Sequence, residues 1–301
     1  MNNLIEKIEK LKKKRNAIIL AHNYQLPEVQ DIADFVGDSL ELAQISAKTD
    51  AKVVVLCGVR FMAETASMIS PKKKILLPDL KSGCPMAEMV NVKKVREMKR
   101  QYPKAAVVCY VNSTAEIKAE SDICCTSSNA LKIVESLKGY KQIIFIPDKY
   151  LGSFLSLSSE KEFIFANGYC PTHARISSEL IDELKVKYKD AKVLVHGECT
   201  PEIKEKADKI LSTGKMCDYV KNSSKKDFII ATEKEIMHRM KKENPGKNLI
   251  QASPLAICLG MKKNNLEKIF NVLENMKNEV KVDRKVEPKA KKCIERMLAV
   301  K

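Results

Sequence analysis

The chain has 301 residues, 45% of them hydrophobic, and its 54 lysines and arginines exceed its 38 aspartates and glutamates, giving a formal net charge of +16. This length and apolar content predict a globular protein with a substantial core. Only 5% of the residues are aromatic and tryptophan is absent, so basic runs such as KLKKKR lack the interleaved aromatic side chains of nucleic-acid-binding segments. We interpret the charge as a lysine-rich surface and expect no nucleic-acid partner.

The first residues, MNNLIEKIEKLKKKRN, carry charge throughout and lack the apolar stretch and cleavage site of a signal peptide. No later apolar run is long enough to cross a bilayer, so the sequence predicts a cytoplasmic protein without membrane contact. Thiols stay reduced in the cytoplasm. The ten cysteines are therefore expected to be buried side chains, metal ligands or nucleophiles.

Three apolar segments each follow an amphipathic, lysine-rich helix and end in polar residues. They are AIILAHNY at 17–24, AAVVCYVNST at 105–114 and AKVLVHGECT at 191–200. Their anchors His22, Tyr110 and His196 are 88 and 86 residues apart. Two more apolar segments follow in each case: AKVVVLCG and KKILLPDL, SDICCTSSN and KQIIFIPDK, and ADKILSTGK and KDFIIATE. Continuous apolar strands that alternate with helices predict parallel sheets covered on both faces.

The predicted fold class is therefore α/β, with three homologous small α/β/α units in a pseudo-threefold arrangement around a central active site. We place unit 1 at residues 1–86, unit 2 at 87–172 and unit 3 at 173–261. The segment NNLEKIFNVLENMK resembles the start of the chain, but no full unit follows it, so the tail 262–301 is predicted to pack back on unit 1. Ligands of parallel α/β sheets bind beyond the carboxyl ends of the strands, which here point at a common centre.

The repeat also ranks the cysteines. Three of them follow the anchors by 62, 60 and 62 residues, and no other three keep this register: Cys84, Cys170 and Cys258. Each lies in a turn-like segment that leaves backbone N–H groups available to sulfur. No C-x-x-C pair occurs, which disfavours a zinc ribbon. Three thiolates that converge from three units are candidate ligands of one 4Fe–4S cluster whose fourth iron is open to substrate as a Lewis acid.

Polar side chains suited to acid–base chemistry and anion binding gather at the same strand ends. They are His22, Asn23, Tyr24, Tyr110, Asn112, Ser127, Ser128, His196, Glu198 and Thr213. Two alternatives to a cluster enzyme stay open. One is a zinc- or iron-dependent hydrolase that uses His22, His173 and His196 with Glu198. The other is a non-catalytic repeat scaffold or metal-binding sensor.

Several longer segments resemble quinolinate synthase of the bacterial and archaeal type: AHNYQLPEVQDIADFVGDSLELA, CGVRFMAETA, CYVNSTAEIKAESDICCTSSNA, GYCPTHARI and HGECTPE. The resemblance implies condensation of iminoaspartate with dihydroxyacetone phosphate to quinolinate, with release of phosphate and water, in NAD biosynthesis. It also implies one oxygen-sensitive 4Fe–4S cluster with three cysteine ligands. The implied partners are these two anionic substrates and an upstream L-aspartate oxidase or dehydrogenase that supplies iminoaspartate.

Carried over residue by residue, the resemblance makes Cys84, Cys170 and Cys258 the cluster ligands. The substrate-binding positions that it implies are His22, Ser39, Tyr110, Asn112, Ser127, His196, Glu198 and Thr213. The hypothetical catalytic residues are Tyr24, His173, His196 and Glu198. Of these, we expect Tyr24 and either His196 or Glu198 to move protons. Ser127 and Thr213 are expected to hold the triose phosphate or the dicarboxylate. Adjacent Cys124 and Cys125 have no assigned role.

Overall fold

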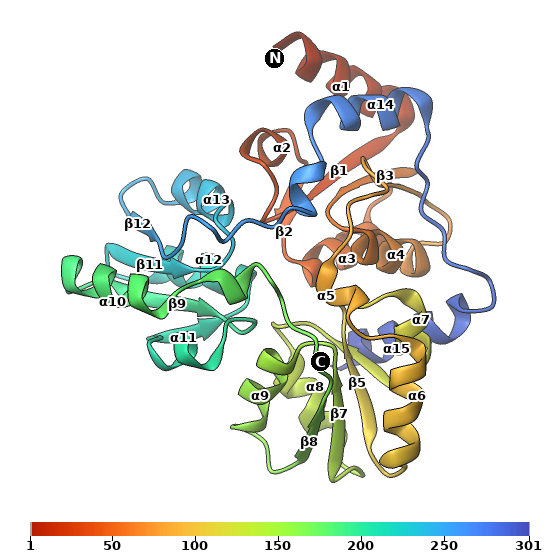
Figure 1. The fold of residues 1–301 in the computed structure, drawn as a ribbon. Helices are drawn as coiled ribbons and strands as arrows, with labels where there is room; N and C mark the ends of the chain where they lie inside the picture. Colours follow the sequence, from red (N-terminus) through yellow and green to blue (C-terminus); the bar gives the residue numbers. More distant parts are fainter. Residues whose placement is uncertain (1, 301) are drawn as a thin grey trace.

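Three parallel sheets of four strands each form the frame of the molecule, and the three α/β units surround a common centre (Figure 1). The structure is a computed structural model that describes residues 2–300. The predicted fold class is confirmed. We name each unit by its sheet: β1–β4 for unit 1, β5–β8 for unit 2 and β9–β12 for unit 3. The residue boundaries between the units stay a prediction.

The strand order is the same in every sheet, with the first strand of each unit lying between the second and the third. All pairs are parallel. In spatial order, the strands are β2 (Phe35–Gly37), β1 (Ala17–His22), β3 (Val53–Cys57) and β4 (Lys74–Leu76); β6 (Ile123–Cys125), β5 (Ala106–Tyr110), β7 (Gln142–Ile146) and β8 (Glu162–Phe165); and β10 (Lys209–Leu211), β9 (Lys192–His196), β11 (Asp227–Ala231) and β12 (Asn248–Gln251).

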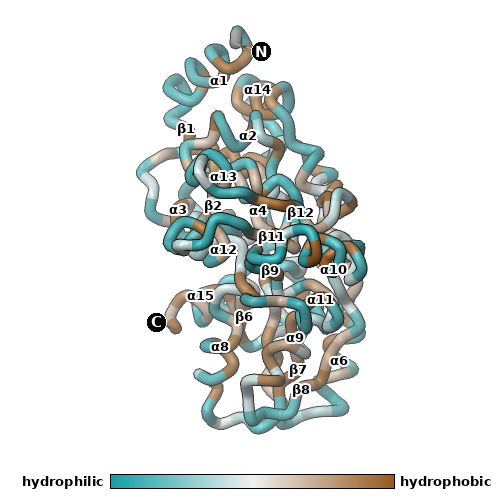
Figure 2. The backbone as a smooth tube through the Cα atoms, turned by 90° about the vertical axis from the view of Figure 1, so that its left-hand side faces the viewer, coloured by the Kyte–Doolittle hydropathy of each residue, from teal (hydrophilic) through white to brown (hydrophobic). Residues whose placement is uncertain are grey.

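Each sheet has four strands, whereas the sequence predicted three per unit, so that prediction is wrong. It missed β2, β8 and β12, each of which lies at the edge of its sheet. β2 has only three residues, and the four residues of β8 are all at least partly exposed, so neither forms the continuous apolar run by which the inner strands are recognised. The inner strands β3 and β5 are buried along their whole length. In Figure 2, buried strands such as β7 are coloured mostly as hydrophobic residues and the surface helices mostly as hydrophilic residues.

Helices cover both faces of the sheets. In chain order they are α1 (Asn2–Arg15), α2 (Pro27–Asp31), α3 (Ser39–Lys48), α4 (Arg60–Ile69), α5 (Pro85–Glu88), α6 (Val92–Gln101), α7 (Ala115–Ala119), α8 (Ala130–Ser136), α9 (Lys149–Ser156), α10 (Ser178–Lys187), α11 (Pro201–Glu205), α12 (Thr213–Asn222) and α13 (Ile236–Glu243), with the single turns η1 (His173–Arg175) and η2 (Met261–Lys263). None of the helices within residues 2–300 combines the length and apolar character needed to span a bilayer; the cytoplasmic location stays a prediction.

The C-terminal tail divides between two units. Helix α14 (Leu266–Asn275) packs beside α1 at the far end of unit 1 (Figure 1), and Arg15 Nη2 donates to the carbonyl of Glu274 at 2.8 Å. Helix α15 (Glu287–Ala299) instead packs on α7 and β6 of unit 2 and on α4 of unit 1. The tail therefore joins units 1 and 2 along a shared apolar core.

One side-chain contact recurs in all three units at the repeat spacing. In unit 1, Asp34 Oδ2 accepts a hydrogen bond from the N–H of Ile19 at 2.7 Å. The equivalent pairs are Asp122 with Val107 and Asp208 with Val193, both at 2.8 Å. Each aspartate thus connects the loop before an edge strand to the central strand beside it.

Replacing Asp122 by alanine should lower the free energy of unfolding by about 1–3 kcal/mol, because the N–H of Val107 loses the carboxylate that accepts its hydrogen bond. Urea unfolding of the two proteins measures this difference. Asp190→Ala, at an exposed position, is the matched control and should change stability by less than about 0.5 kcal/mol. Equal stability of Asp122→Ala and the control would contradict the proposed anchoring.

Candidate functional site

A single cavity of about 70 Å³ lies where the strand ends of the three units meet, and all thirteen predicted site residues line it. These residues are His22, Tyr24, Ser39, Cys84, Tyr110, Asn112, Ser127, Cys170, His173, His196, Glu198, Thr213 and Cys258. They come from segments spread over more than 230 positions of the sequence, between residues 22 and 258. The convergence of parallel strands therefore brings together what the sequence keeps far apart.

Twelve of the thirteen residues form four sets of three, and His173 stands outside them. The members of a set occupy equivalent positions in the three units, 86 or 88 residues apart. In unit order the sets are His22, Tyr110 and His196; Tyr24, Asn112 and Glu198; Ser39, Ser127 and Thr213; and Cys84, Cys170 and Cys258. The repeat spacing alone would have identified Ser39, which sequence reasoning from the residues did not select before the family resemblance.

Each cysteine loop is fixed by the same backbone hydrogen bond. The backbone carbonyl two residues before the cysteine accepts a hydrogen bond from a backbone N–H group. That N–H group lies just after the strand β3, β7 or β11 of the same unit. The pairs are Arg60 with Ser82 at 2.7 Å, Lys149 with Gly168 at 2.9 Å, and Lys234 with Ala256 at 3.0 Å. A single helical turn, α5, η1 or η2, begins shortly after each cysteine. The three loops therefore present their sulfurs to the cavity in the same way.

Burial raises the pKa of all three thiols, to about 12 for Cys84, although backbone N–H groups of the following turn act in the opposite direction. The carboxylate of Glu198 also raises the pKa of Cys170, and that of Glu233 raises the pKa of Cys258. The cysteines consequently stay protonated until a cation compensates the charge of the thiolate. Metal binding at this centre must release protons.

The spacing of the thiols argues against one zinc ion shared by all three. Two ligands of one zinc lie at most about 4.6 Å apart, because each Zn–S bond is about 2.3 Å long. Among the described residues, the one set of three metal-ligating side chains whose atoms all lie within 4.8 Å is Cys170, His173 and Glu198. Cys84 and Cys258 are not part of that set. A group that reaches all three sulfurs must be larger than a single ion.

His22 and His196 are held in the same tautomer. Nδ1 of His22 accepts from the backbone N–H of Tyr24 at 3.1 Å, and Nδ1 of His196 accepts from that of Glu198 at 3.4 Å. Burial lowers the pKa of His22 to about 3 and that of His196 to about 4. Both rings are therefore neutral near pH 7, with the proton on Nε2 available for donation to a ligand.

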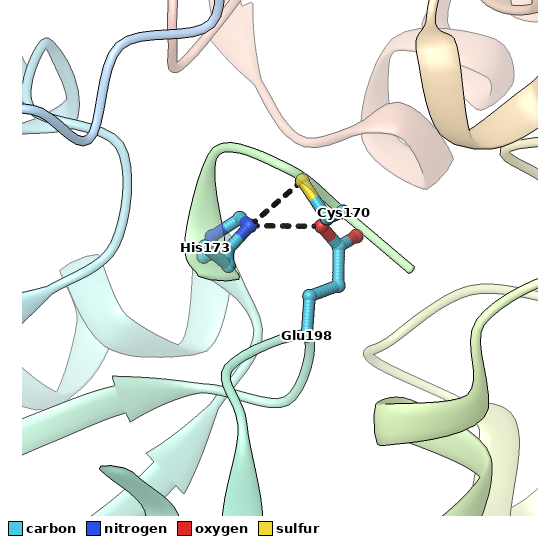
Figure 3. A group of neighbouring side chains, drawn as sticks. All are labelled: Cys170, His173 and Glu198. Atoms are coloured by element: carbon cyan, nitrogen blue, oxygen red, sulfur yellow. Dashed lines mark hydrogen bonds and ion pairs between the residues drawn. The ribbon is translucent and has the colours of Figure 1, made fainter. Parts of the chain in front are cut away.

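Glu198 contacts three other side chains of the cavity, and Figure 3 shows its contact with His173. Its Oε1 accepts from the hydroxyl of Tyr110 at 2.6 Å and from Nδ2 of Asn112 at 3.4 Å. Its Oε2 lies 2.9 Å from Nδ1 of His173. Burial by itself raises the pKa of this carboxyl group, but His173 and Tyr110 together hold it well below its ordinary value. Glu198 is thus a buried carboxylate that joins units 2 and 3.

Thr232 links two of the predicted catalytic residues and was missed by sequence reasoning. Its Oγ1 lies 2.5 Å from the hydroxyl of Tyr24 and 2.8 Å from Nε2 of His173. The His173 ring stacks on that of His196, with centroids 4.8 Å apart. Burial raises the pKa of the Tyr24 phenol, so Tyr24 is neutral. The contacts form a continuous path from Tyr24 through Thr232 and His173 to Glu198.

A buried ion pair fixes the third cysteine loop against unit 1. Glu233 is fully buried; its Oε1 lies 2.7 Å from Nζ of Lys262 and accepts from the backbone N–H of Cys258 at 3.1 Å. Lys262 Nζ also donates to the carbonyl of Tyr24 at 2.6 Å. One lysine therefore positions both a predicted ligand loop and a predicted catalytic loop.

Eight further residues complete the cavity wall: Asp38, Val59, Phe61, Met86, Val111, Thr126, Thr172 and Met261. Asp38 and Thr126 are equivalent in the repeat, and Asp38 caps α3 by accepting from the N–H groups of Leu40 and Glu41. Repeat spacing could have found these two. The apolar members, such as Phe61 and Met261, carry no chemical signal in the sequence, and only the packing of the units assigns them to the cavity.

A family model described as quinolinate synthetase A protein matches residues 6–299 of the chain. A curated relative from Dehalococcoides mccartyi (strain CBDB1), named quinolinate synthase, is 53% identical over 294 residues, which are 98% of this chain and 97% of the relative. One from Alkaliphilus metalliredigens with the same name is 49% identical over 99% of both chains. Quinolinate synthase 2 of Methanosarcina acetivorans is 50% identical over 99% of this chain and 96% of its own.

The neutral histidines predict a measurable dependence of stability on pH. In the unfolded chain a histidine has a pKa of about 6.5, so below that pH the unfolded state binds more protons than the folded state, whose His22 and His196 titrate at about 3 and about 4. Their contribution is complete above pH 6.5 and is lost as the pH falls, by up to about 1.4 kcal/mol per pH unit for each residue. In urea unfolding between pH 6.5 and 4.5, His22→Gln should therefore show a shallower slope than the unchanged protein. Parallel slopes would contradict a buried neutral His22.

Proposed function

The chain belongs to the quinolinate synthetase A family, and we propose that it condenses iminoaspartate with dihydroxyacetone phosphate to form quinolinate, with release of phosphate and water. The resemblance to quinolinate synthase is confirmed, and the chain is an enzyme of NAD biosynthesis. The observation that carries the proposal is the single cavity in which three thiols, a carboxylate and neutral hydrogen-bond donors meet. An upstream L-aspartate oxidase or dehydrogenase would supply iminoaspartate.

Neither alternative from the sequence is favoured. A non-catalytic scaffold does not agree with membership of an enzyme family. A hydrolase with three histidine ligands requires His22, His173 and His196 around one ion, but the described set of close ligand atoms contains only His173 of these three. The rings of His22 and His196 each use Nδ1 for a backbone hydrogen bond.

The donor set fits one 4Fe–4S cluster. Cys84, Cys170 and Cys258 would hold three irons, and their separation suits a group larger than a single ion. Backbone N–H groups beside the sulfurs favour thiolate ligands. When bound, the cluster would supply a Lewis-acidic iron that polarises a substrate oxygen.

Anionic groups of the substrates would bind at the hydroxyls that begin the helices. Thr213 begins α12, where the positive end of the helix dipole favours phosphate or carboxylate, and Ser127, which lies before α8, lines the same cavity. Lys215 lies between them, with Nζ donating to the carbonyl of Ser128 at 2.8 Å. The equivalent start of α3, at Ser39, carries the negative charge of the Asp38 carboxylate, whereas α12 is capped by the neutral hydroxyl of Ser212, so we assign the triose phosphate to Ser127 and Thr213.

The residues that transfer protons are those joined by hydrogen bonds around the cavity. We assign proton transfer to the Glu198 carboxylate and the Tyr24 phenol because both side chains line the cavity. Thr232 and His173 connect the two groups and orient them. His22 and His196 donate hydrogen bonds from Nε2 to substrate oxygens. The apolar wall formed by Val59, Phe61, Met86 and Met261 excludes water and strengthens these interactions.

Removing any one cluster cysteine should prevent assembly of a full cluster. Cys84→Ala, Cys170→Ala and Cys258→Ala, reconstituted anaerobically, should each contain less iron and sulfide than the unchanged protein and form no quinolinate from the two substrates. Cys57→Ala, a buried strand cysteine outside the cavity, is the control and should retain both. A variant of the trio with four irons, four sulfides and full activity would show that the ligand assignment is wrong.

Replacing Tyr24 by phenylalanine should lower kcat by roughly 10²- to 10⁴-fold, because the ring stays but the proton donor is lost. Iron content should not change, since Tyr24 is not a proposed ligand. Anaerobic steady-state kinetics and iron analysis measure both quantities. Tyr219→Phe, whose ring packs on Phe228 away from the cavity, should leave kcat within about twofold, and an equally active Tyr24→Phe would remove Tyr24 from the mechanism.

A further inference from the structure

We propose that the chain without its cluster binds one divalent transition-metal ion, of the zinc, cobalt or ferrous class, through Cys170, His173 and Glu198. The Sγ, Nδ1 and carboxylate oxygen of these residues all lie within 4.8 Å of one another. Figure 3 shows the three side chains close together: His173 from η1, Cys170 from the loop before it and Glu198 from the loop after β9. Thiolate, imidazole and carboxylate together are a ligand set typical of zinc and its substitutes.

The distances need only a small adjustment to admit the ion. Nδ1 of His173 lies 3.1 Å from Sγ of Cys170 and 2.9 Å from Oε2 of Glu198. Tetrahedral bonds of about 2.0–2.3 Å place neighbouring ligand atoms roughly 3.3–3.8 Å apart. The two distances from Nδ1 must therefore increase by less than about 1 Å. Cys170 and His173 stand three residues apart in CPTH, so a single turn already aims both at the same point.

Each imidazole or carboxylate ligand is hydrogen-bonded through the atom that the metal does not use. Nε2 of His173 lies 2.8 Å from Oγ1 of Thr232, which leaves Nδ1 for the metal once the ring proton is on Nε2. Oε1 of Glu198 accepts from Tyr110 at 2.6 Å, which leaves Oε2. Such outer contacts orient metal ligands and raise their affinity. They are a second observation, independent of the ligand distances, that supports a metal site.

A bound divalent cation would also match the negative charge of Glu198. Glu198 is a buried carboxylate whose ion-pair partner, within residues 2–300, is His173 and neither a lysine nor an arginine. Buried charges in proteins are paired or coordinate metals. A divalent ion bound to the Cys170 thiolate and the Glu198 carboxylate makes a neutral centre, and the thiol proton passes to solvent.

The single-ion site and the proposed cluster exclude each other, because both use Cys170. This consequence rests on the proposed function, whereas the site itself does not. Cys84 and Cys258 belong to the cluster alone. Zinc bound at Cys170, His173 and Glu198 should therefore block cluster assembly by competition for one thiolate.

The test is a cobalt titration of the untagged, full-length chain, freed of cluster by chelation under anaerobic conditions. One Co²⁺ per chain should bind, giving sulfur-to-cobalt charge-transfer absorption and the visible bands of tetrahedral cobalt, and Zn²⁺ should displace it. Cys170→Ala, His173→Ala and the nearly isosteric Glu198→Gln should each weaken binding at least about tenfold. Cys84→Ala and Cys258→Ala are matched controls that should bind cobalt normally yet take up no full cluster. Thermal unfolding of each variant establishes that it is folded.

Normal cobalt binding by Glu198→Gln and Cys170→Ala would overturn the proposal. Equal loss of binding in Cys84→Ala and Cys258→Ala would also overturn it, because the metal would then be shared by the three cysteines. Failure of the unchanged chain to take up a 4Fe–4S cluster, with cobalt binding as expected, would instead reject the proposed function and support the single-ion site. Loss of cluster uptake after prior loading with zinc would support the competition.

Discussion

The convergence of three parallel sheets on one centre is the constraint on which the rest of the molecule depends. Parallel strands all end on the same side of their sheet, so each unit delivers its loops to the cavity. Three side chains at equivalent positions of the repeat keep those loops in place. Gln30 Nε2 donates to the carbonyl of Gln25 at 2.8 Å, Lys118 Nζ donates to that of Ser113, and Lys204 Nζ donates to that of Gly197 at 3.3 Å. In each unit a side chain behind the cavity thus holds the loop that follows the first strand.

The threefold frame carries chemistry that is not threefold. The residue two after the first-strand anchor is a tyrosine in unit 1, an asparagine in unit 2 and a glutamate in unit 3. Only the glutamate is a carboxylate, and it accepts hydrogen bonds from unit 2 while pairing with His173. His173 itself has no histidine at its equivalent positions, where unit 1 has Ala87 and the third cysteine loop has Met261. The repeat therefore determines the positions of the side chains around the cavity. The different residue types at equivalent positions determine the chemical role of each side chain.

Burial sets the charge state of nearly every group in the cavity. It keeps two histidines neutral, two tyrosines protonated and three cysteines as thiols. Glu198 in the cavity and Glu233 beside the Cys258 loop each have a partner: His173 for the first and Lys262 for the second. A buried charge is expensive unless it is paired. The cavity can therefore bind a cation through its sulfur atoms. It can bind an anion through neutral hydrogen-bond donors and helix N-termini.

The sequence by itself determined the α/β class, the threefold repeat and the cysteine trio, because strand and helix periodicity and equal spacing are properties of the linear chain. It did not determine the edge strands β2 and β8, which are too short or too exposed to show a pattern, or the division of the tail, in which α15 packs mainly on unit 2. Only the tertiary structure decided that Thr232 joins Tyr24 to His173 and that Lys262 joins Glu233 to Tyr24. It also decided that, among the described residues, the thiol of Cys170 is the one within single-ion distance of His173 and Glu198. Those contacts cross between units, and their geometry follows from how the three sheets are placed relative to one another, which no local pattern of residues encodes.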